Sequence, residues 1–186
     1  MHEELLTAPD TFSASEFSRS TTDPERKWFA LSVNVRHEKQ VSQVLVNKGF
    51  ETFLPLHTRR HRYERRTREF EIPLFPGYLF CRVDPKARLP VLTTPGVLRI
   101  VGAGRVPIPL EDHEIVSLQR AAEAGVSMVP HPFWRSGQRG RVIAGPLAGI
   151  EGIVVGAKHS MRLVISVSLL QRSVLLEIDS DCVAVV

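Results

Sequence analysis

The C-terminal part of the chain is strand-like throughout, and this pattern constrains the fold more than any other feature of the sequence. Short β-branched segments alternate there with turn residues, at positions 142–143, 152–157, 163–167, 173–178 and 183–186. Strands at this spacing are typical of a small closed β-barrel. Valine and isoleucine lower helix propensity, and so do the interspersed glycines, Gly145, Gly149, Gly152 and Gly156. We therefore predict a permanent five-stranded barrel over residues 137–186.

The chain before the barrel mixes predicted helices and strands. Apolar residues at helical spacing predict helices over residues 38–48 and 110–124 and a shorter one over 85–93. Apolar runs bounded by turns predict strands over residues 28–35, 50–54, 78–83 and 97–101. The second long helix is expected to present Ile115, Leu118 and Ala122 to the core. This order indicates an α+β domain over residues 27–125.

Two segments lack such a pattern. Residues 1–26 are rich in Ser, Thr, Asp and Glu, so we predict a disordered acidic tail that buries too little surface to offset its ordering entropy. Residues 126–136 contain Pro130 and Pro132 and have no clear period. They are predicted to be a linker between the two domains.

Composition is that of an ordinary globular protein with a mild basic bias. Of the 186 residues 43% are hydrophobic, and the formal net charge of +4 weakly favours a polyanionic partner. Cys81 and Cys182 each lie in an apolar run, which predicts buried free thiols in a reducing compartment. No apolar run approaches the roughly 18 residues of a membrane span, and the start of the chain has no secretory signal. We expect a cytoplasmic protein.

Residues 57–69 form the most basic segment. Six arginines stand against two glutamates, a local net charge of +4 that equals the formal charge of the whole chain. So polar a block must project as a loop or hairpin. Arginine binds phosphate bidentately and stacks on bases, so the block predicts a nucleic-acid contact; the alternative is a purely solubilising loop. The candidate residues are Arg59, Arg60, Arg62, Arg65, Arg66 and Arg68.

The stretch 73–80 reads PLFPGYLF and concentrates apolar surface beside this block. A strand from Tyr78 places Tyr78 and Phe80 on one side and Leu79 and Cys81 on the other. The rings are either ordinary core or part of an exposed docking surface.

Four motifs match a known family in order and spacing: Trp28-Phe29, Phe75-Pro76-Gly77-Tyr78, Thr94-Pro95-Gly96-Val97 and the glycine-rich residues 145–152. The first three resemble the N-terminal (NGN) domain of the NusG family of transcription elongation factors, and the fourth is similar to the KOW signature. Segment 73–80 is close to that of RfaH-type proteins. The arginine block and residues 169–174 are similar to UpxY-type antiterminators, which indicates a specialised paralogue.

The resemblance implies an NGN domain, with an antiparallel sheet flanked by helices, followed by an SH3-like KOW barrel. It also implies that an apolar cavity on the NGN domain grips the clamp helices of RNA polymerase and that the factor suppresses pausing or termination. The residues expected at this polymerase-binding surface are Phe75, Pro76, Tyr78, Phe80 and Thr94.

Nucleic acid is a second implied partner. The start of the first helix is expected to face the non-template DNA strand through Arg36, His37, Lys39 and Gln40. Asn34 and Gln40 stand where a fully basic reader would carry charge, so a solvated helix face remains the alternative. For the arginine block, upstream duplex DNA, the non-template strand and nascent RNA would all satisfy the chemistry of its arginines.

The barrel is implied to recruit a further partner, either a ribosomal small-subunit protein or the termination factor Rho. Leu147 and Ile150 would form that surface and Arg172 its rim, although from the residues alone core packing is the ordinary outcome for Leu147 and Ile150. We expect a monomer that joins transcription complexes at the nucleoid and binds no membrane.

Catalysis, cofactors and metals are not expected. Gly102-Ala103-Gly104 lacks the third glycine of a dinucleotide fingerprint, and no nucleophile has an identifiable base. His57 and His61 lie four residues apart without a Cys or carboxylate partner for a metal. The competing hypotheses are a ribosome-associated RNA-binding KOW protein and an enzyme with an unfamiliar site.

Overall fold

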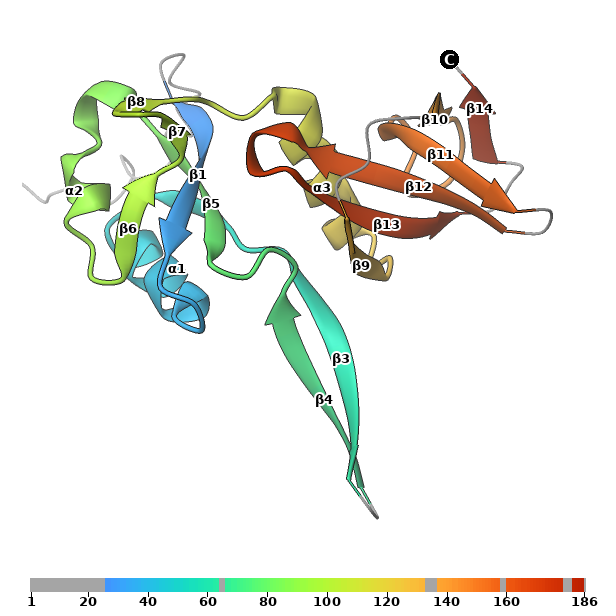
Figure 1. The fold of residues 1–186 in the computed structure, drawn as a ribbon, viewed down its shortest axis with the longest axis horizontal. Helices are drawn as coiled ribbons and strands as arrows, with labels where there is room; N and C mark the ends of the chain where they lie inside the picture. Colours follow the sequence, from blue (N-terminus) through green and yellow to red (C-terminus); the bar gives the residue numbers. More distant parts are fainter. Residues whose placement is uncertain (1–25, 64–65, 133–136, 158–159, 179–181, 186) are drawn as a thin grey trace, which may run out of the picture.

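The computed structural model describes residues 26–63, 66–132, 137–157, 160–178 and 182–185, so the tail predicted over residues 1–26 lies outside it except for Arg26. Figure 1 shows two sheet-based modules side by side, with a long hairpin projecting from the first. The α+β class expected from the sequence is confirmed.

The first module is built on an antiparallel sheet with the strand order β2-β5-β1-β6. β1 pairs with β5 from Lys27 opposite Val83 to Ser32 opposite Tyr78. The bounds of these strands are β1 (Lys27–Val33), β2 (Glu51–Phe53), β5 (Tyr78–Val83) and β6 (Val97–Ile100).

Alternation along β1 and β5 divides the side chains of this sheet between two apolar clusters. On one face Phe29, Leu79 and Cys81 pack with Val41 and Val91 of the helices α1 (Glu38–Asn47) and α2 (Leu89–Leu92). A short 3₁₀ turn, η1 (Pro85–Ala87), precedes α2. Trp28, Ala30 and Phe80 belong to the cluster on the opposite face. This is the division of Phe80 from Leu79 and Cys81 that strand periodicity predicted.

The opposite face lies against α3 (Asp112–Glu123), whose buried row contains Ile115, Leu118 and Ala121. Ala122 was expected in this row, but it is exposed because the inward positions follow each other in steps of three. Gly125, with a φ of 65°, ends the helix as predicted.

Two hairpins extend from the first module. β3 (Leu56–Tyr63) and β4 (Arg66–Pro73) form the long one, which confirms that the arginine block projects as a hairpin (Figure 1). β7 (Gly102–Ala103) and β8 (Val106–Pro107) form a small one that the sequence did not indicate.

The second module is all-β, with the order β14-β10-β11-β12-β13-β9. Its elements are β9 (Met128–Pro132), β10 (Gln138–Val142), β11 (Glu151–Ala157), β12 (Ser160–Val167), a 3₁₀ turn η2 (Ser168–Leu170), β13 (Arg172–Ile178) and β14 (Val183–Val185). β9 adds a strand to the predicted five and lies inside the segment expected to be an irregular linker. The prolines of β9 are tolerated because β9 is an edge strand of this sheet and pairs on one side with β13.

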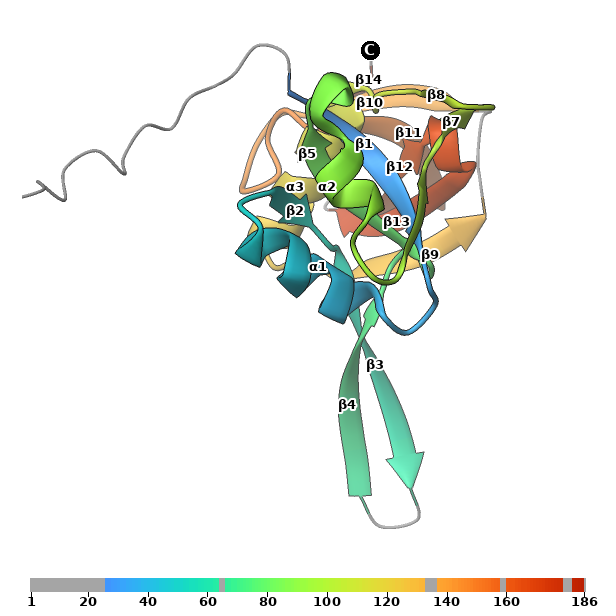
Figure 2. The same ribbon diagram turned by 90° about the vertical axis from the view of Figure 1, so that its left-hand side faces the viewer.

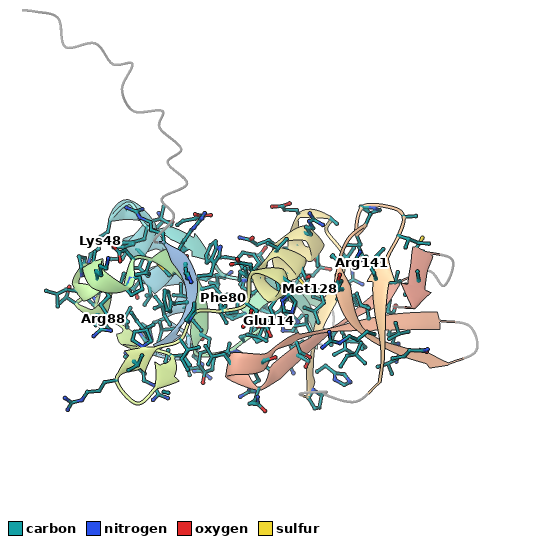
Figure 3. All side chains as sticks on the ribbon, turned by 90° about the horizontal axis from the view of Figure 1, so that it is seen from above. Lys48, Phe80, Arg88, Glu114, Met128 and Arg141 are labelled. Atoms are coloured by element: carbon teal, nitrogen blue, oxygen red, sulfur yellow. The ribbon has the colours of Figure 1, made fainter. Side chains whose placement is uncertain are left out.

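The two modules share one apolar core. The cluster that holds Trp28 and Phe80 also contains α3 side chains and barrel residues such as Leu147, Ile165 and Leu176. Figures 1 and 3 place α3 and the turn between β12 and β13 next to the same face of the first sheet. Within the described ranges, none of the helices has the length and apolar character that crossing a bilayer demands.

Candidate functional site

The PLFPGYLF stretch forms a tight turn that enters β5. Gly77 has a φ of 80°, and the backbone N–H of Tyr78 donates to the Phe75 carbonyl at 3.0 Å, as in a type II turn with Pro76 and Gly77 at its centre. The backbone N–H of Gly77 donates to the carboxylate of Glu38 at 2.8 Å. Because Glu38 is buried on α1, this bond fixes the turn to the helix. We call Phe75–Tyr78 the aromatic turn.

An aromatic cluster lies beside this turn. The rings of Phe53 and Phe80 stack with centroids 6.1 Å apart, and Phe75 meets Phe80 edge-on at 5.6 Å. Phe75 and Phe80 are 2% and 0% exposed, Tyr78 is half-buried and Pro76 is exposed. The core alternative for the two phenylalanines therefore holds in this arrangement, and within the aromatic turn only Pro76 and Tyr78 present surface.

Thr94, the fifth residue of the expected polymerase surface, does not join the ring cluster. Its hydroxyl donates to the Pro90 carbonyl at 2.9 Å, and Lys48 Nζ donates to it at 2.8 Å. Thr94 therefore stabilises the end of α2. The Gly96 turn nevertheless approaches the aromatic turn, because Val33 N–H donates to Gly77 O and Asn34 N–H to Gly96 O.

Basic and polar residues of the turn before α1 and of the first turn of α1 form an exposed surface next to these two turns, which we call the basic surface. Arg36 has a φ of 72°, an unusual value for a residue with a Cβ. Arg36, His37, Lys39 and Gln40 are all exposed. Lys39 Nζ, in the first turn of α1, lies 3.0 Å from Glu71 Oε2 on β4. The start of α1 and the base of the hairpin therefore lie next to each other, as the ribbon in Figure 2 shows.

The hairpin brings Arg59, Arg60 and Arg68 into exposed positions. Arg60 pairs with Glu69 at 2.7 Å. Arg65 lies outside the described residues, as do the side chains of Arg62 and Arg66. At the base of the hairpin, partial burial lowers the pKa of His57, and the charge of Arg59 lowers it further.

The loop between β10 and β11 carries two apolar residues that are buried where the barrel meets α3. Leu147 and Ile150 are 6% and 1% exposed. Arg120 Nη1 donates to the Ala148 carbonyl at 3.1 Å, and a Cβ on Gly149 (φ 87°) would lie 2.7 Å from the same nitrogen. Arg172, at the start of β13, is exposed. Leu147 and Ile150 thus serve as core here, and their role in partner binding stays a prediction.

A second polar contact joins α3 to the barrel. The backbone N–H of Ser168, in η2, donates to Glu114 Oε1 at 2.9 Å, and Glu114 is buried. Figure 3 shows Glu114 and Met128 between the two modules. Sequence reasoning missed Glu38, Glu114 and Arg120, because nothing local in the sequence marks the distant backbone groups that they hold.

A cleft of about 530 Å³ opens between the start of α3 and the barrel. Its lining includes His113, Arg139, Arg141 and Glu151. Arg141 is paired with Glu151, and that hydrogen bond and charge lower the pKa of the carboxyl. Among the described residues, no group of three or more His, Cys, Asp or Glu side chains is arranged to hold a metal ion.

The family model for the transcription termination factor NusG matches residues 26–119, just over half of the chain. The chain belongs to the NusG family. The match runs from the start of β1 into α3, so it includes the aromatic turn and the basic surface.

Curated relatives of this NusG-family protein carry the name transcription termination/antitermination protein NusG. The protein from Thermus thermophilus is 32% identical over 117 residues, covering 57% of this chain and 64% of the relative. That from Helicobacter pylori strain J99 is 29% identical over 61% of this chain and 66% of its own length. The Pseudomonas aeruginosa protein is 25% identical over 83% of this chain and 95% of its own length. The chain therefore spans about two thirds of the first two relatives and nearly all of the third.

A solved structure of Thermotoga maritima NusG, described by its domain interaction, has the same fold. It superposes with a TM-score of 0.52 and 19% identity, covering 86% of this chain and 97% of the other. The likeness extends over both modules and supports the expected NGN and KOW architecture.

Proposed function

We propose that this NusG-family protein is a transcription elongation and antitermination factor that binds the clamp helices of RNA polymerase through its first module. The observation that carries the proposal is the aromatic turn within the matched region, held in one conformation by Glu38 and presenting Pro76 and Tyr78 at its surface. A turn fixed in this way loses little conformational freedom on binding, so more of the contact energy appears as affinity.

The burial of Phe75 and Phe80 sets a condition on this binding. Their rings lie in the core shared with α3 and the barrel, so a helical partner reaches them only when that face is uncovered. The same separation would expose Leu147 and Ile150 to a second partner, for which a ribosomal small-subunit protein and Rho are the candidates. We infer that both surfaces become available together.

The exposed basic turn and hairpin are proposed to contact nucleic acid in the same complex. Arg36, His37 and Lys39 lie within one surface with the hairpin base, which suits a strand leaving the polymerase beside the bound factor. A factor placed in this way suppresses pausing, because it binds the elongating state more tightly than the paused state.

Recovery of core RNA polymerase by the full-length chain tests the proposal. The double variant Pro76→Ala with Tyr78→Ala removes the accessible part of the aromatic turn and leaves the buried rings of Phe75 and Phe80 in place. Leu89→Ala is the matched control, since Leu89 is an exposed apolar residue on the helix-covered side. We expect the double variant to lose recovery and the control to keep it. Equal recovery by both, with unchanged urea midpoints, contradicts clamp-helix docking.

A further inference from the structure

The β3–β4 hairpin has two chemically different faces. Directly opposed residues of an antiparallel pair share a face, and the face changes with each step along the strand. Arg59 lies opposite Phe70, and Arg68 precedes Phe70 by two residues on β4. Arg59, Arg68 and Phe70 therefore share one face, which we call the basic face.

Carboxylates gather on the other face. Arg60 lies opposite Glu69, and Thr58 lies opposite Glu71. Glu69 neutralises Arg60 at 2.7 Å, and Glu71 pairs with Lys39 of α1 at 3.0 Å. Phosphates approaching this face would meet acids that are already in ion pairs, so it is a poor surface for a polyanion.

The basic face carries no acidic residue among its described side chains, and it carries an exposed ring. Phe70 is 43% exposed, because the protruding hairpin offers this ring no core in which to pack. Its cross-strand neighbour is the guanidinium-bearing Arg59, and both Arg59 and Arg68 are exposed. Cations that neutralise phosphates beside an aromatic platform suit unpaired bases, because every base has a face that stacks on a ring.

We infer that the hairpin binds single-stranded nucleic acid through the basic face, with Arg59 and Arg68 on phosphates and Phe70 stacked on a base. The inference rests on the proposed function only in placing the hairpin near an exposed strand. The sequence treats the six arginines of the block as equivalent candidates, whereas the inference assigns binding to those on the basic face. It also identifies the ligand as an unpaired strand and not a duplex. In duplex DNA the bases are already stacked on each other, so Phe70 would have nothing to stack on.

Fluorescence anisotropy of a labelled oligonucleotide with the full-length chain tests this directly. Arg59→Gln and Arg68→Gln each remove one charge from the basic face, and Arg60→Gln is the matched control on the other face of the same hairpin. We expect each basic-face variant to weaken single-strand binding on the order of tenfold and to lower the salt slope by about 0.7. The control should change nucleic-acid affinity by less than about twofold, because Glu69 already neutralises the charge of Arg60.

Phe70→Leu tests stacking, because leucine keeps the apolar volume and removes the ring. It should weaken single-strand binding about fivefold or more and leave the weaker duplex binding unchanged. DNA and RNA strands of one sequence form separate arms. Binding of either supports the inference, and the tighter one identifies the source.

Three outcomes would overturn the inference: equal losses of single-strand affinity for Arg60→Gln and Arg59→Gln, duplex binding as tight as single-strand binding, or no measurable single-strand binding.

The polymerase recovery assay is run on the same variants. Wild-type chain that binds oligonucleotide but recovers no polymerase contradicts only the proposed function. Chain that recovers polymerase but ignores the oligonucleotide contradicts the present inference and leaves the proposed clamp-helix docking standing.

Discussion

The carboxylate of Glu38 accepts a 2.8 Å hydrogen bond from the backbone N–H of Gly77, which joins the first turn of α1 to the aromatic turn 39 residues away. Both groups are buried, so neither has water as a substitute partner.

Replacing Glu38 with alanine should destabilise the protein by about 1–3 kcal/mol, because the Gly77 N–H is then left without an acceptor. Glu38→Gln keeps an amide oxygen at the same position and should lose less. Urea unfolding of the two variants measures the difference. An alanine variant as stable as wild type would show that water or a shifted side chain replaces the bond.

Arg120→Ala should loosen the contact between α3 and the barrel, because the Ala148 carbonyl loses its donor. If the buried rings are the polymerase site, this variant should recover more polymerase than wild type. Arg162→Ala is the control, since it breaks an exposed pair with Glu177 within the barrel. Decreased recovery by Arg120→Ala alone would indicate that the joined arrangement, and not the separated one, binds polymerase.

The two thiols should react at very different rates. Burial and the nearby Glu51 charge raise the pKa of Cys81 to about 12, so almost no thiolate exists at neutral pH. Cys182 is only half-buried. Iodoacetamide should modify Cys182 in the native protein and Cys81 only after unfolding, as mass spectrometry of the peptides would report. Comparable native labelling at both sites would contradict the burial of Cys81.

Acid should weaken the folded state through His57. Its folded pKa lies below the ordinary histidine value of 6.5, so below that pH the unfolded chain binds the proton more readily. The free energy of unfolding should fall as the pH drops from 6.5 through the folded pKa. His57→Gln should remove this part of the pH dependence, measured as the difference between wild-type and variant urea midpoints across that range. Parallel pH profiles would assign the dependence to other groups.

Local sequence predicted the elements whose pattern is complete within one segment. β5 matches its expected bounds, α1 begins at Glu38, and the arginine block projects as a hairpin because so many charges have no place in a core. The barrel strands were recognised from their β-branched residues.

Contacts between distant segments were not predictable in the same way. Glu114 reaches Ser168 across 54 residues, and no spacing rule connects an acid on a helix to a backbone N–H on a barrel turn. The local sequence predicts a linker at β9 because its prolines suppress strand propensity, yet pairing with β13 supplies what the local sequence lacks. The burial of Phe75 could not be predicted from the sequence either, because it depends on which module covers the ring.

The core shared by the two modules makes the barrel a tethered competitor for whatever binds the buried rings. A partner's apparent dissociation constant then equals its intrinsic value divided by the uncovered fraction, so a fraction of about 1% weakens capture roughly a hundredfold. If the proposed function holds, small changes at Arg120 or Glu114 would tune the occupancy of the polymerase without altering any atom that contacts it.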